Sequence, residues 1–421
     1  MLNSTLIVNK KNCPSTCNLC VDACANKKFS PNAFIEKVDI PELDYHSVSV
    51  CNQCSQPLCM YTCPTGAISQ LKTGTTIVDT KKCIGCGLCN MACPYGGIYP
   101  HKHNKEVEKC ILCGQCAKAC PENILEFKQV KPIEDKLQED PFVPGLQFCV
   151  GCGLEWVDRF IMQTIGTNVT LFGAPSCNVT SSRVKTSYYG TLMTNVASSA
   201  TGVSRYYRRI GSDRICLAII GDGATADLGF GQLSGAAERN EHILYVCYDN
   251  EAYMNTGIQR SSTTPYGSWT TTTQVGSVDH GRKGTPKNVP LLMAYHNIEY
   301  VATATLAYPE DLMKKLLKAK EAVKNGMAYV HILTPCPTGW KYKPEHGVEI
   351  TRAAVETNYF PLWEAENGKI KLTHEVKNPL PIKAYTSLMK RFSHLTDEQL
   401  ATIQNQVNKS YNTLLNIVSN S

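Results

Sequence analysis

The sequence predicts two structured parts: an α/β doubly wound domain at residues 148–421 and, before it, an α+β domain at residues 1–128. Sixteen of the 22 cysteines fall between Cys13 and Cys120, which marks the first part. After residue 148, apolar strand-like blocks alternate with helix-like blocks, which is typical of a sheet covered by helices. The segment 129–147 holds three prolines and six charged residues, which indicates a linker.

The cysteines of the first part form four quartets with regular spacing. The third and fourth match the C-x2-C-x2-C-x3-C-P run of bacterial ferredoxins without deviation. The first departs from it, with three residues after its first cysteine and Ala25 in place of the final proline. Zinc also binds C-x-x-C pairs, but a zinc site needs no repeated three-cysteine loop closed by Cys-Pro. The spacing therefore predicts a ferredoxin-like domain with four 4Fe–4S clusters, whose ligands are Cys13, Cys17, Cys20, Cys24, Cys51, Cys54, Cys59, Cys63, Cys83, Cys86, Cys89, Cys93, Cys110, Cys113, Cys116 and Cys120.

The order of the quartets predicts how they pair. The segment between Cys63 and Cys83 indicates a short hairpin joining two cluster loops, as in a two-cluster ferredoxin. The second and third quartets then form an inner pair, and the first and fourth remain as an outer pair. This nested order resembles the four-cluster subunits of hydrogenases and formate dehydrogenases. Sharing of the fourth cysteine within each pair groups the ligands as Cys51, Cys54, Cys59 with Cys93; Cys83, Cys86, Cys89 with Cys63; Cys13, Cys17, Cys20 with Cys120; and Cys110, Cys113, Cys116 with Cys24.

Charge and hydropathy exclude several classes of protein. The first twenty residues carry no apolar core and no cleavage site, so we expect a cytoplasmic protein whose thiols bind metal instead of forming disulfides. No apolar run reaches the roughly 18 residues that a membrane span requires. The formal net charge is +6. Four clusters at roughly −2 each would reverse the positive charge of the first part. Without a helix-turn-helix or aromatic–basic pattern, we expect no nucleic-acid binding.

Five near-continuous apolar blocks of the second part predict a parallel sheet covered on both faces. They span residues 169–172, 214–220, 242–248, 299–304 and 328–333. A helix is expected at 309–325, because Pro309 stands at its start, acidic residues follow, and Gly326 comes after its end. In such sheets the ligands bind at the carboxyl ends of the strands.

Polar residues stand at two of these strand ends. Gly221-Asp222-Gly223 follows the second block and, after 26 intervening residues, Asn250 follows the third. A lone Gly-Asp-Gly is more often a simple turn, but this interval matches the thiamine-diphosphate motif. Glycines let the backbone approach a diphosphate closely. Carboxylate and amide oxygens suit Mg²⁺, which also takes phosphate oxygens.

The stretch that begins Tyr248-Asp-Asn-Glu-Ala-Tyr-Met-Asn-Thr-Gly and runs to Thr273 carries a closer resemblance. Together with Phe148-Cys-Val-Gly-Cys-Gly and Thr334-Pro-Cys-Pro-Thr-Gly-Trp, it resembles the beta subunit of pyruvate:ferredoxin oxidoreductase, within the 2-oxoacid:ferredoxin oxidoreductases. The resemblance runs from about Gly145 to at least Gly368. It implies a domain that binds thiamine diphosphate and a further 4Fe–4S cluster.

The resemblance also implies roles for single residues. Asp222 and Asn250 hold Mg²⁺ together with the backbone carbonyl of Ala252, and Asn255 and Thr256 face the reacting end of the cofactor. Cofactor contacts are expected from Gly221, Asp222, Gly223, Ala224, Asn250, Ala252 and Asn255. The fifth cluster falls on Cys149, Cys152, Cys177 and Cys336, two of them on Pro-containing turns.

Other residues have a plainer interpretation. Cys216 and Cys247 lie within apolar blocks and are expected in the core. His242 and His331 are interpreted as packed or surface residues. The run at 206–209 is interpreted as the solvated end of a helix, with contact to a partner or to CoA phosphate as the alternative. The tail 380–421 is amphipathic and helical, either packed on its own domain or clasping a partner.

The activity implied by the resemblance is oxidation of a 2-oxo acid. Pyruvate, CoA and oxidised ferredoxin would give acetyl-CoA, CO2 and reduced ferredoxin, with the reverse direction also open. Other 2-oxo acids (2-oxoglutarate, branched-chain or aryl) and oxalate remain open. A non-catalytic polyferredoxin electron-transfer subunit is a second hypothesis, and non-redox thiamine chemistry is a third. The intact Gly-Asp-Gly and Asn pair argues against the second, and five predicted clusters argue against the third.

One component of thiamine catalysis is missing from the sequence. Thiamine enzymes use a glutamate to activate the aminopyrimidine ring, usually from a second domain, and neither Glu155 nor Glu251 is convincing. We therefore expect separate alpha-type and gamma-type subunits, which supply that glutamate and the contacts to substrate and CoA. Ferredoxin or another redox enzyme is the expected electron acceptor.

Overall fold

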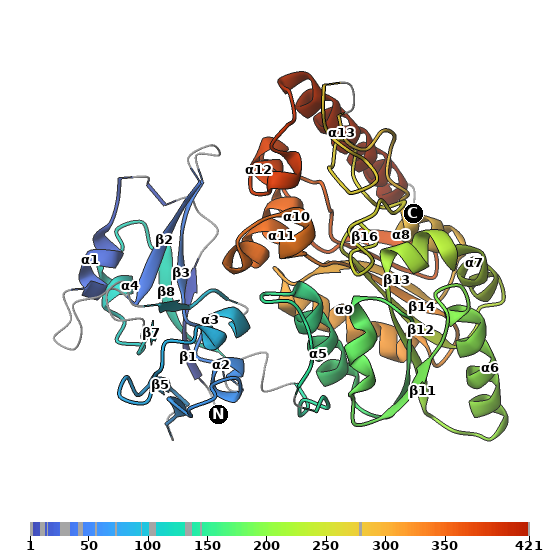
Figure 1. Ribbon diagram of the computed structural model, residues 1–421, viewed down its shortest axis with the longest axis horizontal. Helices are drawn as coiled ribbons and strands as arrows, with labels where there is room; N and C mark the ends of the chain where they lie inside the picture. The colour runs from blue at the N-terminus through green and yellow to red at the C-terminus, as the bar shows by residue number, and fades with distance from the viewer. Residues whose placement is uncertain are drawn as a thin grey trace. The chain divides into compact units, whose positions relative to one another are not determined.

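The computed structural model describes residues 3–8, 13–14, 16–25, 34–40, 45–54, 57–71, 74–93, 95–100, 107–130, 137–143, 145–277 and 280–419 (Figure 1). The chain divides into two compact units, residues 1–137 with 344–346, and residues 138–343 with 347–421. Of the predicted linker 129–147, residues 131–136 and 144 lie outside the described residues. Its residues 138–143 belong to the second unit, where Gln138 N–H donates to the carbonyl of Gln163 at 2.9 Å.

The first unit is assembled from short antiparallel strand pairs and short helices. The pairs are β1 (Asn3–Val8) with β8 (Leu125–Val130), β2 (Ile35–Ile40) with β3 (Tyr45–Val50), β4 (Ile68–Gln70) with β5 (Thr76–Val78), and β6 (Ile98–Pro100) with β7 (Val107–Lys109). The helices are α1 (Leu19–Ala25), α2 (Leu58–Tyr61), α3 (Leu88–Ala92) and α4 (Gln115–Ala119). The pair β4–β5 confirms the hairpin predicted between Cys63 and Cys83.

Cysteines make up much of the interior of this unit. One buried cluster joins Cys20, Cys24, Cys51, Cys110 and Cys116 to a few aliphatic and aromatic side chains. A second joins Cys59 and Cys89 to the strand residues between them. Little aliphatic surface is buried in these clusters, so we expect the stability of this unit to depend on what its thiols bind.

The second unit is built on one eight-stranded sheet in the order β10-β9-β11-β12-β14-β13-β15-β16. The first six strands in this order are parallel to one another. These are β9 (Val169–Gly173), β10 (Ser187–Gly190), β11 (Ile215–Gly221), β12 (Ile243–Asp249), β13 (Tyr300–Thr305) and β14 (Ala328–Leu333). All five predicted strands are confirmed, with ends that differ by a residue. β10 is an additional strand at the edge.

The far edge of the sheet departs from the prediction. β15 (Trp363–Glu366) pairs antiparallel with β13, and β16 (Lys369–Leu372) pairs antiparallel with β15. The turn between them is Asn367-Gly368, and both residues have positive φ, 51° and 76°, as a type I′ hairpin requires. The sheet is therefore mixed, not purely parallel.

Helices cover both faces of the sheet. α6 (Val196–Arg209), α7 (Phe230–Glu238) and α8 (Val289–Tyr295) lie in crossovers that advance from β10 toward β13. α9 (Pro309–Ala322) lies in the crossover from β13 back to β14. Because crossovers are right-handed, this reversal places α9 on the opposite face. There α9 packs with α5 (Gly153–Ile165). The predicted helix 309–325 is confirmed and ends three residues earlier.

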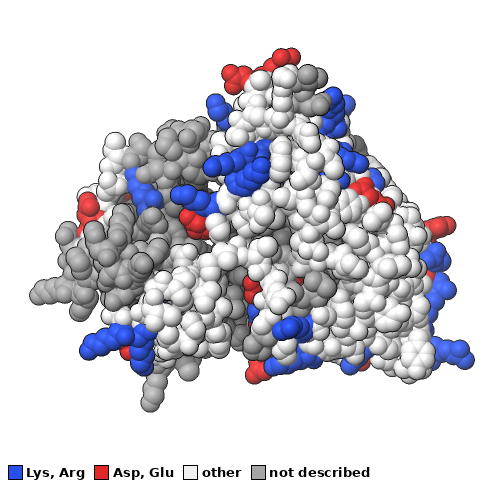
Figure 2. All heavy atoms as spheres, in the orientation of Figure 1, with Lys and Arg blue, Asp and Glu red and all other residues white. Residues whose placement is uncertain are grey.

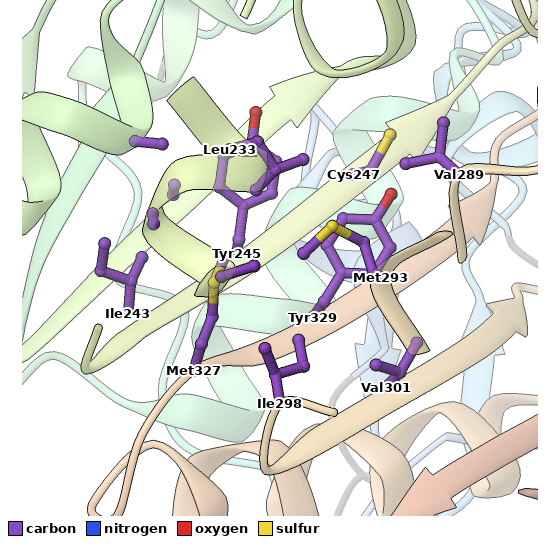
Figure 3. Packing of buried hydrophobic residues seen from close by; sticks show 14 of the residues in the cluster. Leu233, Ile243, Tyr245, Cys247, Val289, Met293, Ile298, Val301, Met327 and Tyr329 are labelled. Atoms are coloured by element: carbon purple, nitrogen blue, oxygen red, sulfur yellow. The ribbon is translucent and has the colours of Figure 1, made fainter. Parts of the chain in front are cut away.

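The core of the sheet is visible in Figure 3. Tyr245 of β12 and Tyr329 of β14 stack with ring centroids 6.0 Å apart, and Met293 of α8 lies in the same cluster. Cys216 and Cys247 are buried in this cluster, which confirms that they are core residues. The run at 206–209 ends α6 with Arg208 and Arg209 exposed, as predicted.

The C-terminal part adds a second layer of helices. It consists of α10 (Pro337–Trp340), α11 (Gly347–Glu356), α12 (Lys383–Thr386) and α13 (Asp397–Ser419), with the 3₁₀ turn η6 (Lys390–Phe392). The 3₁₀ turn η5 (Pro344–His346) is grouped with the first unit. Trp340, Ile350, Tyr385 and Ile403 share one buried cluster with Leu333 of β14. The tail is therefore packed on its own unit, as one of the two interpretations expected.

Two further observations concern membrane-spanning helices and surface charge. Within the described residues, no helix is both long and apolar enough to cross a membrane. Figure 2 shows the Lys and Arg side chains of one face as separate groups between wide uncharged areas.

Candidate functional site

The predicted motif residues meet at the carboxyl ends of two central strands. β11 ends at Gly221 and is followed by Asp222 and the π-helical turn η4 (Gly223–Leu228), and β12 ends at Asp249 and is followed by Asn250. Gly223 has no space for a side chain, because an added Cβ would lie 2.5 Å from the Tyr253 ring. Ala224 is buried in the same turn. The tight turn and the buried strand ends hold the polar groups at a fixed edge of the sheet.

Three oxygen atoms converge at this edge. The Asn250 amide points its Oδ1 at the Ala252 carbonyl oxygen, 2.9 Å away, and at Asp222 Oδ1, 3.1 Å away. Oxygens in contact without a shared proton repel each other, unless a cation lies between them. Adjacent ligands of an octahedral Mg²⁺ at 2.0–2.1 Å are about 2.9 Å apart. The opposite amide orientation would convert both contacts into hydrogen bonds, so the site accommodates either orientation, and the oxygen-inward one offers three oxygens to a metal.

Negative charge is concentrated around these oxygens. The hydroxyl of Thr263 lies 3.0 Å from Asp222 Oδ2 and 2.9 Å from Asp249 Oδ1, so two buried carboxylates share one hydroxyl group. Burial raises the pKa of Asp222 well above its usual value, and the charge of Asp249 raises it further. A bound cation would reverse this effect, because it stabilises the carboxylate form.

His331 anchors the second carboxylate from the neighbouring strand β14. Its Nε2 lies 2.9 Å from Asp249 Oδ2, and its Nδ1 lies 2.7 Å from the Tyr329 hydroxyl. The ring therefore donates to the carboxylate and accepts from the tyrosine. His331 is buried in the sheet, so the prediction of a packed residue is confirmed.

Glu251 is committed to a buried ion pair with Arg391 of η6. Tyr359 also donates a hydrogen bond to the Glu251 carboxylate. The Arg391 guanidinium lies 4.1 Å above the Trp340 ring, and Trp340 Nε1 donates to the Asn250 carbonyl at 2.8 Å. Glu155 is likewise paired, with Arg159 at 3.0 Å. Both glutamates are thus paired with arginines, and no local sequence pattern indicated a role for Arg391.

Asn255 and Thr256 lie on the loop that follows Ala252, and both are exposed. The Thr256 hydroxyl lies 2.6 Å from Gln259 Oε1. The structure thus brings Gly221, Asp222, Gly223, Ala224, Asn250 and Ala252 to one edge and leaves Asn255 and Thr256 on the adjoining loop. Their place at the reacting end of a cofactor stays a prediction.

The four cysteines predicted for a fifth cluster also come together. Cys149 and Cys152 precede α5, Cys177 begins the 3₁₀ turn η3 (Cys177–Ser182) after β9, and Cys336 caps α10 after β14. Burial raises the pKa of Cys152 to about 12, and the thiols of Cys336 and Cys177 contribute. Burial likewise raises the pKa of Cys177 to about 12, with contributions from Cys336, Cys149 and the Asp222 carboxylate. The thiols therefore lie near one another and near the oxygen site.

Two cavities in the first unit are each lined by one of the ligand groups predicted for the inner clusters. The first is lined by Cys63, Cys83, Cys86 and Cys89. The second is lined by Cys51, Cys54, Cys59 and Cys93. Each cavity thus takes three thiols from one quartet and the fourth from the other, which is the sharing expected of a two-cluster ferredoxin.

In the outer quartets, too, thiols of one quartet have thiols of the other quartet as charged neighbours. Burial raises the pKa of Cys20 to about 11, and Cys13, Cys116 and Cys120 add to the effect. Burial also raises the pKa of Cys116 to about 11, with Cys24 as its strongest charged neighbour. Among the described residues, no three His, Cys, Asp or Glu side chains converge on a single-ion site. The oxygen group around Asn250 contains only one side chain of these types.

A comparison with characterised proteins decides the family. The beta subunit of NADH-dependent phenylglyoxylate dehydrogenase from Aromatoleum evansii is 40% identical over 428 aligned residues, covering 96% of this chain and 95% of the relative. This chain is a beta-type subunit of the 2-oxoacid:ferredoxin oxidoreductase family. The C-terminal domain model of thiamine pyrophosphate enzymes matches residues 167–332, and two 4Fe–4S dicluster models match residues 42–130 and 109–154.

Other relatives of this beta-type subunit match about two thirds of the chain. Pyruvate synthase subunit PorB from Methanothermobacter thermautotrophicus is 43% identical over 280 residues, covering 65% of this chain and 96% of that protein. Ketoisovalerate oxidoreductase subunit VorB from Pyrococcus furiosus is 39% identical over 284 residues, covering 64% and 90%. The names refer to different 2-oxo acids, so family membership identifies an oxidoreductase subunit and leaves the substrate undecided.

Proposed function

We propose that this chain is the catalytic, thiamine-diphosphate-binding subunit of a CoA-acylating 2-oxoacid oxidoreductase. The observation that carries the proposal is the oxygen site of Asp222, Asn250 and Ala252, with a cysteine quartet beside it at the same edge of the sheet. Bound thiamine diphosphate supplies the carbanion chemistry that releases CO2 from a 2-oxo acid. The neighbouring thiols would hold a 4Fe–4S cluster, which takes up single electrons.

Each group at the site has a definite task under this proposal. Asp222, Asn250 and the Ala252 carbonyl would hold Mg²⁺, whose remaining positions take diphosphate oxygens. Gly223 leaves the backbone open to the diphosphate. Glu251 stands between Asn250 and Ala252, so its ion pair with Arg391 fixes these two ligands in place before the metal binds. Asn255 and Thr256 are proposed to face the substrate end of the cofactor.

Pyruvate is the proposed substrate, converted with CoA and an oxidised acceptor to acetyl-CoA and CO2. Support comes from the stretch Tyr248–Thr273 and from the identity to a pyruvate synthase subunit over 96% of its length. The test is reduction of methyl viologen by the purified complex with pyruvate and CoA. If the complex binds thiamine diphosphate yet reduces no dye with any 2-oxo acid, this chain would instead be a non-catalytic electron-transfer subunit.

An aryl 2-oxo acid is the second candidate, because one observation favours it. The phenylglyoxylate dehydrogenase subunit matches both units of this chain, whereas the pyruvate synthase and ketoisovalerate relatives above cover about 65%. A side-by-side comparison of kcat/KM for pyruvate and phenylglyoxylate separates the two. The same preparation tests the acceptor, with ferredoxin and NAD compared as oxidants.

The activating glutamate is proposed to come from a partner. Glu155 and Glu251 are both paired with arginines, so we propose alpha-type and gamma-type subunits that supply the glutamate and the CoA contacts. The isolated chain, loaded with clusters and thiamine diphosphate, should oxidise no 2-oxo acid at an appreciable rate. A normal rate from this chain alone would remove the need for that partner.

Five clusters are proposed in all, four held in residues 1–128 and one in residues 148–421, with 129–147 as the linker. The cavities and thiol neighbours described above support the five quartets of ligands. Twenty cysteines in five quartets predict about twenty irons per chain. Iron analysis of the intact chain measures this directly, and about eight irons would contradict it.

A further inference from the structure

The two inner cavities of the first unit differ in one side chain. Strand β7 (Val107–Lys109) points alternate residues inward, so Val107 and Lys109 are both buried. Val107 lines the cavity of Cys63, Cys83, Cys86 and Cys89. Lys109 lines the cavity of Cys51, Cys54, Cys59 and Cys93. One strand therefore presents an apolar group to one cavity and an ammonium group to the other.

Lys109 has sulfur atoms as its partners. Its side chain is only 3% exposed, and its Nζ lies 3.9 Å from Cys59 Sγ. Cys51 and Cys54, which line the same cavity, are further charged neighbours of its ammonium group. Within the described part of the chain, Lys109 forms no ion pair with a carboxylate. A buried ammonium group is strongly disfavoured without a counter-charge, and among the described residues the four thiols of this cavity, with what they bind, are the groups placed to supply it.

We propose that Lys109 is the buried counter-ion of the cluster held by Cys51, Cys54, Cys59 and Cys93, and that it raises the reduction potential of this cluster alone. The inference rests on the proposed clusters. A 4Fe–4S cluster with four thiolates is an anion, and reduction adds one more negative charge. A fixed cation in a poorly hydrated cavity stabilises the reduced form more than the oxidised form. Val107 offers no such stabilisation to the neighbouring cluster.

The chain provides a matched control. Lys82 stands directly before Cys83, as Lys109 stands directly before Cys110. The Lys82 side chain is 63% exposed and pairs with Asp79 at 3.8 Å. Water screens its charge, so its removal should leave every cluster potential unchanged.

The test is an EPR-monitored redox titration of the full-length chain with its clusters. Lys109→Met should lower the ratio of reduced to oxidised cluster at least about tenfold at the original midpoint, which equals 59 mV for a one-electron couple. Lys109→Arg should keep most of the original potential, and Lys82→Met should match the unmodified chain. The affected component is identified by Cys54→Ser in the same background.

Three results of the redox titration would overturn the proposal. These are an unchanged midpoint potential in Lys109→Met, an equal shift of the potentials of all components, or the same shift in Lys109→Arg. If Lys109→Met loses the cluster while Lys109→Arg keeps it, the requirement for charge is supported, and loss in both variants refutes it. Iron analysis of the unmodified chain separates this question from the proposed function. Too few irons would contradict the cluster assignment, whereas a full complement with an unresponsive potential would contradict only the role of Lys109.

Discussion

Replacing Arg391 tests whether the C-terminal tail of the chain stabilises the loop Asn250–Ala252, which carries two of the proposed metal ligands. The side chains of Glu251 and Arg391 are 4% and 2% exposed, so neither is solvated once its partner is removed. Breaking a buried pair of this kind costs about 3–5 kcal/mol. Arg391→Met keeps much of the side-chain volume, so the cost is mostly electrostatic. The double variant Glu251→Gln/Arg391→Met leaves no unpaired charge and should recover about 2 kcal/mol or more relative to the sum of the single changes.

Amide hydrogen exchange measures this cost locally. Trp269 N–H donates to the Arg391 carbonyl at 3.1 Å, so its exchange reports opening of this contact. A loss of about 3 kcal/mol corresponds to exchange roughly a hundredfold faster. The amides of α13 near residue 414, away from the pair, serve as an internal control. A loss under about 1 kcal/mol, or a double variant no better than the sum, would refute the reasoning.

The same variant has a predicted pH dependence. Burial raises the pKa of Glu251 in the folded chain, and Arg391 opposes this rise. An acid whose folded pKa is raised holds its proton more tightly when folded, so stability falls as pH rises from about 4.3 toward the folded pKa. Removing Arg391 enlarges the rise. The loss of folding stability caused by Arg391→Met should therefore be smaller at pH 5 than at pH 8. A loss that does not depend on pH would contradict the interpretation that an unpaired Glu251 carboxylate causes it.

Three further changes address the cofactor edge. Asp222→Asn keeps the shape but removes the charge, and it should weaken Mg²⁺-dependent binding of thiamine diphosphate roughly tenfold to a hundredfold by calorimetry; unchanged affinity would exclude Asp222 as a ligand. Gly223→Ala places a Cβ against the Tyr253 ring, so cofactor content should fall while the circular dichroism spectrum is kept. Cys336→Ser should lower iron by about four per chain with thiamine diphosphate content unchanged, and loss of both would show that the two sites are not independent.

Local sequence patterns were sufficient to predict the main strands of the second unit and its helix α9. Long apolar blocks become strands because burial on both faces tolerates no polar alternation, and β11, β12 and β14 follow this rule throughout. The β15–β16 hairpin also had a local signal, the Asn367-Gly368 turn, which outweighs the expectation of a purely parallel sheet. Cysteine spacing likewise predicted which thiols share a cavity, since it encodes the loop geometry directly.

Contacts between distant segments could not be predicted in this way. Arg391 meets Glu251 across 140 positions of the chain, and Thr263 reaches both buried carboxylates from a loop without regular structure. A lone arginine or threonine has no periodicity, so only the folded chain shows its partner. Lys109 is similar. Nothing local distinguishes it from Lys82, although one is buried against thiols and the other is exposed.

The position of Arg391 has a consequence for biosynthesis. Synthesis delivers the chain from its N-terminus, and domains generally fold in that order. All sixteen cysteines of the first unit leave the ribosome long before Arg391 does, so cluster insertion there can begin while the thiamine domain is still incomplete. The loop Asn250–Ala252 is completed later, because Arg391, which neutralises Glu251, follows it by 140 residues. Chains cut short before Arg391 would thus contain every cysteine of the first unit but leave Glu251 without its buried partner.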